Sequence, residues 1–229
     1  MLRKLFKIIG YKPVKTDKKK TIPYIYHDID IIFDVGGNIG QYAIEARENG
    51  FKGKIISFEP LEQEYAILLK KSKKDKLWII HERCAVGANN FETKINVSKN
   101  SYSSSLLKMH DLHTSSDKSS IYVDINNTKV ISLDSIFNKY RINNEKIYLK
   151  IDTQGYEKLV LEGIKENLTN ISVIEIELSI EYLYEGQELY NYYFDFFEMN
   201  KFKLWTLKPG FKNKQTGQLL QFDAVFVKT

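Results

Sequence analysis

The stretch DVGGNIG, residues 34–40, comes directly after an apolar run, Ile29–Val35, and leads into a helical pattern, Gly40–Asn49. A buried strand, a glycine-rich turn and a helix in this order begin an α/β unit whose ligand approaches the backbone of the turn. Three glycines in the turn leave no Cβ between that backbone and a ligand. The stretch therefore predicts both the fold and the place of its ligand site.

Strand and helix patterns alternate along most of the remaining chain. Apolar runs predict seven strands: Ile29–Val35, Lys54–Phe58, Leu77–Arg83, Lys146–Ile151, Ile171–Leu178, Phe202–Leu207 and Leu219–Val227. Amphipathic segments predict five main helices: Gly40–Asn49, Leu61–Lys73, Leu133–Tyr140, Tyr156–Asn167 and Gln187–Asn200. This alternation predicts an α/β domain with a mostly parallel seven-stranded sheet and helices on both faces. No helix separates the last two strands, so the final strand is expected to be antiparallel, at or near an edge.

The middle of the chain departs from this alternation. Phe91–Val97 and Ile121–Ile125 are short strand patterns on either side of a serine-rich segment, Ser98–Ser120. Connections of this length in a compact domain are usually functional or disordered. We therefore expect the segment to be a loop near the ligand site.

The composition is that of one ordinary globular domain of 229 residues. The 34 Lys and Arg against 29 Asp and Glu give a net charge of +5, and much of the excess lies in residues 1–20. We expect a basic, amphipathic segment, residues 1–28, before a catalytic domain, residues 29–229. We expect residues 1–20 to pack against the domain, and weak peripheral contact with a membrane is the alternative. The sequence does not determine the oligomeric state.

Cysteine content and hydropathy limit the location of the protein. Cys84 is the only cysteine, which excludes an intrachain disulfide and a thiolate metal cluster. No apolar run approaches the ~20 residues that span a bilayer. The basic residues among the first apolar ones, and the lack of a small-residue cleavage site, argue against a secretory signal. The expected location is the cytoplasm.

The glycine turn selects among nucleoside ligands. A dinucleotide fingerprint needs a second glycine where this chain has Asn38, so NAD is disfavoured. Asp34, at the end of the strand, suits a cationic ligand such as S-adenosylmethionine better than a diphosphate. Glu59 follows 25 positions later at the tip of the second strand, where a carboxylate can accept both ribose hydroxyls. The residues expected to contact this cofactor are Asp34, Gly36, Gly37, Asn38, Gly40, Glu59, Pro60, Cys84, Ala85, Ser105 and Asp152.

An ordered series of segments resembles the FkbM-type methyltransferases, which depend on S-adenosylmethionine. The segments are Phe33–Gly40, Phe58–Pro60, Cys84–Gly87, Ser103–Leu106, Ser132–Asp134, Leu149–Glu157, Ile176–Leu178 and Phe222–Val227. Gly37 stands where the family often has Ala, and Thr153 where Val is usual; neither change removes a functional group. The resemblance runs from about Ile31 to the C-terminus. It implies a Rossmann-like class I fold and O-methylation of hydroxyls on secondary metabolites or on sugars of cell-surface glycans.

The chemistry is expected at the ends of the fourth and fifth strands. Methyl transfer to oxygen needs an aligned acceptor and a group that takes its proton. Asp152 is the preferred catalytic carboxylate, with helix capping as its alternative. Glu177, at the adjacent strand end, is the second, and together the two could hold Mg²⁺, although a salt bridge to a lysine is equally compatible. Gln154 and Tyr156 are the expected acceptor contacts.

Some polar and aromatic clusters are interpreted as structural. His110 and His113 lie three positions apart in the serine-rich segment, where such pairs usually have no chemical role. Ser103–Ser105 instead favour contacts with cofactor or acceptor. The aromatic run between Tyr182 and Phe197 predicts a helix packed on the sheet, with an acceptor wall as the alternative.

Three other functions were weighed. A nucleic-acid or other N-methyltransferase is disfavoured because Asp152–Gly155 contains no proline, whereas enzymes that methylate exocyclic amines usually have an Asn/Asp-Pro-Pro-aromatic run there. A non-catalytic cofactor-binding subunit is disfavoured by the intact acidic positions. An NAD-dependent oxidoreductase lacks both its fingerprint and a Tyr-x-x-x-Lys dyad. A small-molecule or glycan acceptor is therefore expected, with no nucleic-acid partner.

Overall fold

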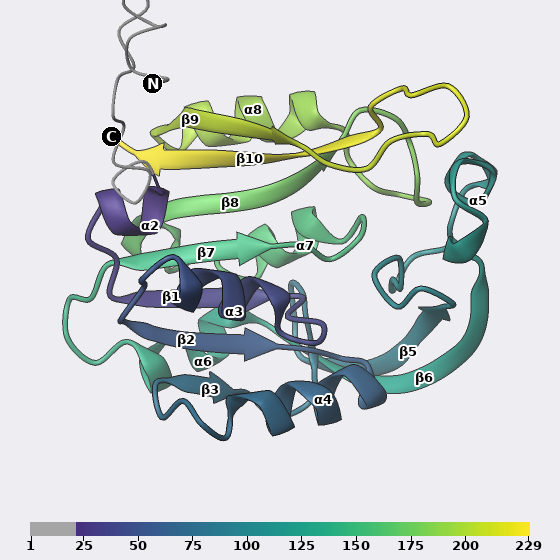
Figure 1. The fold of residues 1–229 in the computed structure, drawn as a ribbon. Coiled ribbons are helices and arrows are strands. Elements are labelled where there is room, and N and C mark those ends of the chain that lie inside the picture. The colour runs from purple at the N-terminus through teal and green to yellow at the C-terminus, as the bar shows by residue number, and fades with distance from the viewer. Residues whose placement is uncertain (1–21) are drawn as a thin grey trace, which may run out of the picture.

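The computed structural model describes residues 22–229, which form two connected sheets. The main sheet has seven strands in the order β3-β2-β1-β7-β8-β10-β9. These are β1 (Ile31–Val35), β2 (Lys54–Phe58), β3 (Trp78–Ile80), β7 (Ile147–Ile151), β8 (Ile171–Ser179), β9 (Phe202–Pro209) and β10 (Gln221–Lys228). The five strands from β3 to β8 are parallel, and β10 is antiparallel to both of its neighbours. The predicted fold class is confirmed, and β10 lies next to the edge strand β9 (Figure 1).

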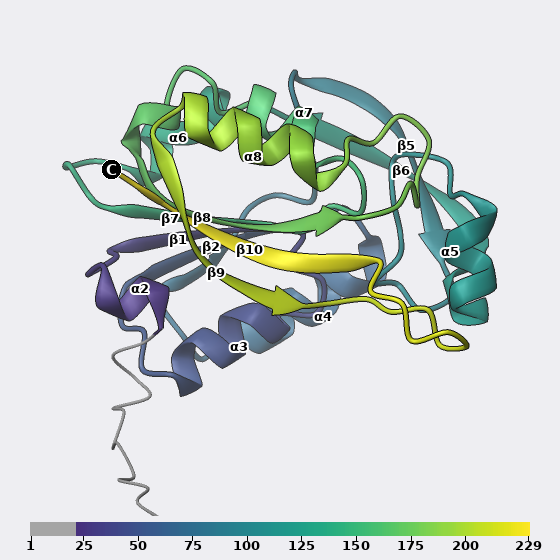
Figure 2. The ribbon, with the colours of Figure 1, turned by 90° about the horizontal axis from the view of Figure 1, so that it is seen from above.

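Helices cover both faces of this sheet (Figure 2). The face that carries α2 (Pro23–Tyr26), α3 (Gln41–Glu48) and α4 (Glu62–Ser72) is called the front face. The face that carries α6 (Leu133–Tyr140), α7 (Glu157–Glu162) and α8 (Tyr190–Met199) is called the back face. The predicted helices at Tyr156–Asn167 and Gln187–Asn200 are shorter than expected. Helix α7 stops at Gly163, where an added Cβ would lie 2.0 Å from the Gly87 carbonyl oxygen, so the backbones touch there.

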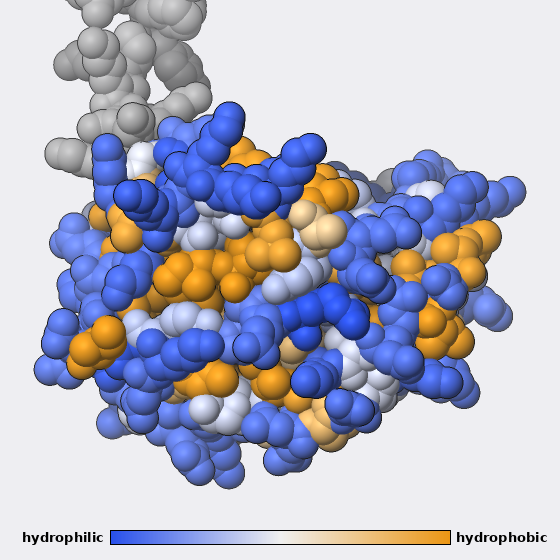
Figure 3. Space-filling view, turned by 90° about the horizontal axis from the view of Figure 1, so that it is seen from below, coloured by the Kyte–Doolittle hydropathy of each residue, from blue (hydrophilic) through white to orange (hydrophobic). Residues whose placement is uncertain are grey.

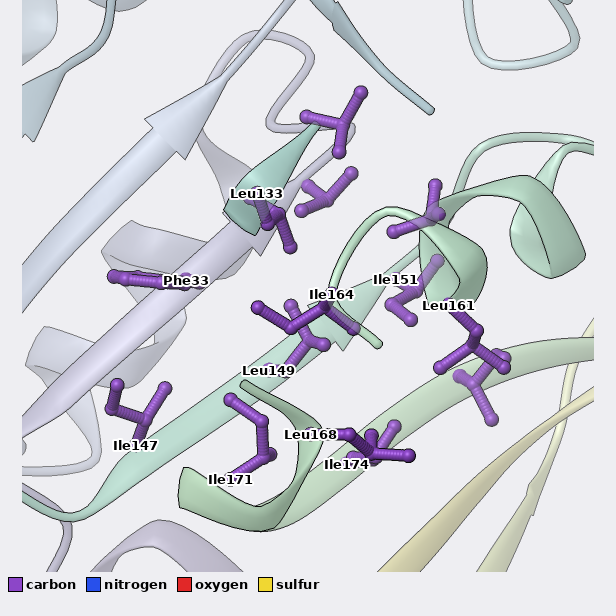
Figure 4. Close-up of a cluster of buried hydrophobic side chains, with 14 of the residues drawn as sticks. Phe33, Leu133, Ile147, Leu149, Ile151, Leu161, Ile164, Leu168, Ile171 and Ile174 are labelled. Carbon is purple, nitrogen blue, oxygen red and sulfur yellow. The ribbon is translucent and has the colours of Figure 1, made fainter. Parts of the chain in front are cut away.

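The back face holds the larger hydrophobic cluster. Phe33 from β1, Leu149 from β7 and Ile174 from β8 have no exposed surface, and helices α6, α7 and α8 pack on them. Figure 4 shows these side chains interlocking between the strands and the helices. The front-face cluster is smaller and includes Tyr24 of α2. Helix α2, which precedes the expected boundary at residue 29, is therefore part of the packed domain.

The two short strand patterns that flank the serine-rich segment are confirmed as strands, and the segment between them contains a short helix as well as loops. Strand β5 (Phe91–Ser98) and strand β6 (Tyr122–Ile131) form a long antiparallel ribbon, with β4 (Ala85–Val86) on the other side of β6. Between β5 and β6 lies α5 (Asp111–Ser116), followed by a 3-10 turn at Lys118–Ser120. The ribbon extends past the carboxyl ends of the main sheet (Figure 1). It thereby brings the serines to the edge at which ligands are expected.

The outer edge at β3 carries exposed apolar side chains. Ile67 is 42% exposed, Leu77 45% and Ile79 38%. Figure 3 shows apolar surface on this side of the molecule, divided by hydrophilic side chains. Among the described residues, no helix is long and apolar enough to cross a membrane. The expectations of an amphipathic helix and of membrane contact concern residues 1–20, outside the described part of the chain.

Candidate active site

A cavity lies at the carboxyl ends of β1, β2, β7 and β8, where the strand order reverses between β1 and β7. This is the position at which open α/β sheets bind their ligands. The β5–β6 ribbon supplies the opposite wall through Ile95, Ser101, Tyr102, Ser104 and Leu106. Ten of the residues predicted from the sequence line the cavity: Gly36, Asn38, Glu59, Pro60, Cys84, Ala85, Asp152, Gln154, Tyr156 and Glu177.

The glycine turn begins with a close backbone approach. Gly36 has φ of +82°, and an added Cβ would lie 1.9 Å from the carbonyl oxygen of Asp152, so no other residue fits. The amide N–H groups of Gly36 and Gly37 both donate to the carbonyl of Phe58, at 3.1 and 2.9 Å. The turn is therefore fixed to both neighbouring strands.

Glu59 fastens the rest of the turn. Its Oε2 accepts the amide N–H of Asn38 at 2.7 Å, and its Oε1 accepts that of Leu61 at 2.7 Å. Burial raises the pKa of Glu59 to about 8. Each carboxylate oxygen has two lone pairs, so one remains on each for a ligand hydroxyl. Glu59 thus combines a structural role with the predicted position for a ribose contact.

Asp34 lies behind the cavity wall, which corrects the predicted contact with a cofactor. The side chain has no exposed surface, and its Oδ2 accepts a hydrogen bond from Ser57 Oγ at 2.8 Å. Ser57 Oγ in turn accepts the indole N–H of Trp78 at 2.9 Å. Strand alternation explains the outcome, because Asp34 points under the turn while the following residues form it.

Three further predicted contacts also lie outside the cavity lining. Gly40 packs on Trp78, since an added Cβ would meet the indole ring at 2.6 Å. Gly37 faces the groove on the front face instead. Ser105 is buried, and its hydroxyl donates to the carbonyl of Gln154 at 2.6 Å, so it holds the neighbouring loop. These residues shape the cavity from behind.

The loop after β7 joins two carboxylates through one amide. Gln154 Nε2 donates to Asp152 Oδ1 at 2.9 Å and to Glu177 Oε2 at 2.6 Å. Gln154 adopts a left-handed backbone, φ +56°, next to Gly155 at +95°. Such a conformation is costly for a residue with a Cβ and persists only where the surroundings impose it. Gln154 therefore lines the cavity, and its side-chain amide also holds the Asp152 and Glu177 carboxyl groups in place.

Glu157 holds this loop from below. Its Oε1 accepts the amide N–H groups of Thr153 and Gly155, each at 3.1 Å, and the Thr153 hydroxyl at 3.1 Å. Burial raises the pKa of Glu157 to about 7. Glu157, which begins α7, therefore anchors the loop that carries Thr153 and Gln154.

Asp152 and Glu177 sit in different surroundings. The Asp152 side chain is 34% exposed, and the ammonium of Lys150 lies 3.0 Å from its Oδ2. Burial raises the pKa of Glu177 well above its usual range, and the charge of Asp152 adds to the shift. Gln221 Nε2 donates to the same Glu177 oxygen at 2.8 Å. The two carboxyl groups therefore have different partners: Asp152 faces the Lys150 ammonium, and Glu177 accepts from two side-chain amides.

A hydrogen-bond chain that sequence reasoning missed fixes the Gln154 amide. The hydroxyl of Tyr184 donates to Gln154 Oε1 at 2.8 Å and lies 3.1 Å from His113 Nε2. Ser120 Oγ lies 2.9 Å from His113 Nδ1 and 2.6 Å from the carbonyl oxygen of Asp117. His113 was interpreted as having no chemical role; it links the serine-rich segment to the carboxylate pair. No spacing in the sequence signals this contact.

The described residues contain no group of three or more His, Cys, Asp and Glu placed to hold a metal ion. Glu177 Oε2 already accepts two amide N–H groups, from Gln154 and Gln221. Cys84 is buried at the cavity wall, and burial raises the pKa of its thiol to about 12, so it provides an apolar surface.

The chain was compared with known families and structures. A family model described as "Methyltransferase FkbM domain" matches residues 34–204. None of the curated proteins compared matches the sequence. An uncharacterized protein from Listeria monocytogenes serotype 4b superposes with a TM-score of 0.50 at 9% identity, over 94% of this chain and 69% of that one.

Two other solved structures are similar at slightly lower scores. TehB from Haemophilus influenzae gives a TM-score of 0.49 at 9% identity, over 98% of this chain and 66% of its own. TrmK from M. capricolum, in complex with S-adenosyl-homocysteine, gives 0.48 at 13% identity, over 88% and 63%. The described chain thus spans about two thirds of the length of these structures. Identities this low bear on the fold alone.

The strand order and the cavity at its reversal define a Rossmann-like methyltransferase fold. The family match covers the glycine turn, Glu59, the loop after β7 and Glu177. The chain belongs to the FkbM methyltransferase family.

Proposed function

We propose that the protein transfers a methyl group from S-adenosylmethionine to a hydroxyl of a sugar, glycan or secondary metabolite. The observation that carries the proposal is the pair of carboxyl groups, Asp152 and Glu177, joined by the Gln154 amide at the wall of the cavity. A carboxylate beside the reacting hydroxyl can accept its proton as the oxygen attacks.

The cavity residues fit the cofactor. Gly36 lines the cavity with backbone atoms alone, and Glu59 keeps lone pairs for the two ribose hydroxyls. Pro60, Cys84 and Ala85 give an apolar wall suited to an adenine ring. The acidic groups at the other end suit a sulfonium and an ammonium. When bound, S-adenosylmethionine supplies an activated methyl, whose bond to sulfur breaks with the electron pair staying on sulfur as the acceptor oxygen bonds to carbon.

Asp152 is the proposed proton acceptor. It is the more exposed of the two carboxylates, and the Lys150 ammonium 3.0 Å away supplies a counter-charge. Glu177 keeps the Gln154 amide aligned, and burial raises the pKa of its carboxyl group well above the usual range. Tyr156, at the cavity wall, and Gln154 are the proposed acceptor contacts.

The test is a labelled-methyl transfer assay with purified protein. We expect label on neutral glycosides or hydroxylated metabolites, and none on added tRNA. The same assay with EDTA is expected to retain activity, because the Lys150 ammonium, 3.0 Å from Asp152 Oδ2, already neutralises that carboxylate and would repel a cation there. Label on tRNA would instead support a nucleic-acid methyltransferase, and loss of activity with EDTA that Mg²⁺ restores would support a metal site.

A further inference from the structure

A second hollow lies on the front face of the sheet, between α3 and β9. It is lined by residues of α2, α3, β7, β8, β9 and β10, and it is called the front groove. The front groove and the cofactor cavity share four lining residues, Gly36, Asn38, Tyr102 and Asp152. Asp152, the proposed proton acceptor, therefore borders both spaces.

The floor of the front groove is a polar band that crosses neighbouring strands. Lys150 of β7 is in register with Glu175 of β8, and Asp223 of β10 is in register with Lys208 of β9. Lys150 is only 9% exposed and Glu175 only 5%. Charges this deeply buried need partners. Lys150 pairs with Asp152 at 3.0 Å, and Lys208 pairs with Glu175 at 2.9 Å.

The band keeps hydrogen-bonding capacity for a ligand. An ammonium has three N–H donors, and among the described residues Lys150 Nζ uses one, to Asp152. Asp223 accepts no side-chain hydrogen bond from any residue between 22 and 229, although it lines the groove. Tyr42 adds an aromatic side at 5.4 Å from Lys150 Nζ. Donors, acceptors and a ring face are the groups that recognise a sugar.

The charge balance of the groove selects against anions. Its acidic lining residues are Glu45, Asp152, Glu175 and Asp223, and its basic ones are Lys150 and Lys208. Both lysines are already paired, so an incoming phosphate or carboxylate would face acidic groups without compensation. Hydroxyl groups can donate to the free carboxylates and accept from the free ammonium hydrogens.

We propose that the front groove binds the methyl acceptor, and that this acceptor is a neutral polyhydroxylated molecule such as a sugar residue. The inference rests on the proposed function, because the reacting hydroxyl must reach Asp152, which borders both groove and cavity. Its oxygen bonds to the methyl carbon, and its proton passes to the Asp152 carboxylate.

The experiment tests the proposal by filling the front groove with a larger side chain. Thr206 of β9 lines the groove, while the next residue, Leu207, points to the other side of the strand and is 50% exposed. Thr206→Trp therefore fills the groove, and Leu207→Trp is the matched control. Thr206→Arg serves as a second obstruction if the tryptophan variant does not fold. Each protein is loaded with S-adenosylhomocysteine, whose affinity is measured by calorimetry and is expected to be the same within about twofold.

Binding of the acceptor class is read by saturation-transfer NMR with methyl α-D-mannopyranoside and with mannose 6-phosphate. We expect a glycoside signal with wild type and with Leu207→Trp, a signal at least fivefold weaker with Thr206→Trp, and a weaker signal from the phosphate. No glycoside signal with wild type, a signal that survives the obstruction, or preference for the phosphate would overturn the inference. Failure of wild type to bind S-adenosylhomocysteine would instead refute the proposed function.

Discussion

The two faces of the main sheet are built from the same strands and do different work. On the back face, Phe33 and Leu149 are fully buried in hydrocarbon under three helices. On the front face, their immediate neighbours Asp34 and Lys150 are buried among polar groups. Because successive strand residues point to opposite faces, one strand can serve a packed core and a polar site together.

The two faces separate the residues that stabilise the fold from the residues proposed to take part in the reaction. Strands covered on both faces usually read as continuous apolar runs. Here β8 alternates Ile174, Glu175, Ile176 and Glu177; the isoleucines belong to the back-face cluster, Glu175 to the polar band, and Glu177 to the wall of the cofactor cavity. The front-face helices pack on the apolar residues of the sheet and leave the band open to the groove. A change on one face should therefore affect mainly one of the two properties.

The largest expected effect on kcat comes from the substitution Asp152→Asn on the front face. Loss of a general base costs about 10²–10⁴-fold in kcat. The asparagine oxygen can still accept from Lys150, whose buried ammonium keeps the charges of Asp34 and Glu175 nearby, so the free energy of unfolding should fall by about 1–3 kcal/mol, as for a weakened hydrogen bond to a charged group. Methyl transfer, calorimetry with S-adenosylhomocysteine and denaturant unfolding measure the three properties. Full activity in this variant would remove Asp152 from the mechanism.

The reverse pattern is expected on the back face for Leu149→Ala. Leu149 has no exposed surface, and removing a buried leucine side chain costs about 2–5 kcal/mol. Urea unfolding should show this loss, while kcat at a temperature where the variant is folded should stay within about twofold. The exposed Leu77→Ala, on the β3 edge, is the control with little effect on stability. A large fall in kcat for folded Leu149→Ala would show that the two faces are coupled.

The third prediction concerns His113, a buried polar residue outside the main sheet. Burial lowers the pKa of His113 from 6.5 to about 4, so the unfolded chain takes up a proton that the folded one refuses. Its contribution is fully present above pH 6.5 and is lost as the pH falls from 6.5 towards 4. The loss amounts to about 3 kcal/mol.

Unfolding measured across this pH range tests the expectation. His113→Gln should flatten the pH dependence of the unfolding free energy, while His110→Gln, at an exposed position, should keep the wild-type slope. An unchanged slope in His113→Gln would assign the pH dependence to other groups.

The smallest expected effect comes from Tyr184→Phe. The variant loses the hydrogen bond that orients the Gln154 amide, worth about 1 kcal/mol, so kcat should fall about fivefold. Affinity for S-adenosylhomocysteine should not change, because Tyr184 does not line the cofactor cavity. Tyr182→Phe, 55% exposed, is the matched control. Equal kcat in the two variants would show that Tyr184 contributes only to packing.

Much of the fold and part of the site could be predicted from the sequence. The apolar runs gave all seven strands of the main sheet, and the turn at Gly36 gave the position of the cavity, because both depend on local patterns. The direct contact expected of Asp34 failed because the glycine turn rises above the strand end while the aspartate points beneath it.

Contacts between segments that lie far apart in the chain could not be predicted from the sequence. His113, Tyr184 and Gln154 meet only because the β5–β6 ribbon brings α5 to the ends of β7 and β8. Glu175 of β8 pairs with Lys208 of β9, and β10 lies between these two strands, so the contact follows from the order of the whole sheet. A serine-rich segment of low periodicity did not indicate a helix at α5.

The measurement that tests the account most directly is calorimetric titration of wild-type protein with S-adenosylhomocysteine and, separately, with NADH. The glycine turn with Asn38, together with Glu59, predicts micromolar-range binding of S-adenosylhomocysteine and no binding of NADH. Binding of NADH with no heat from S-adenosylhomocysteine would contradict the assignment of the cavity.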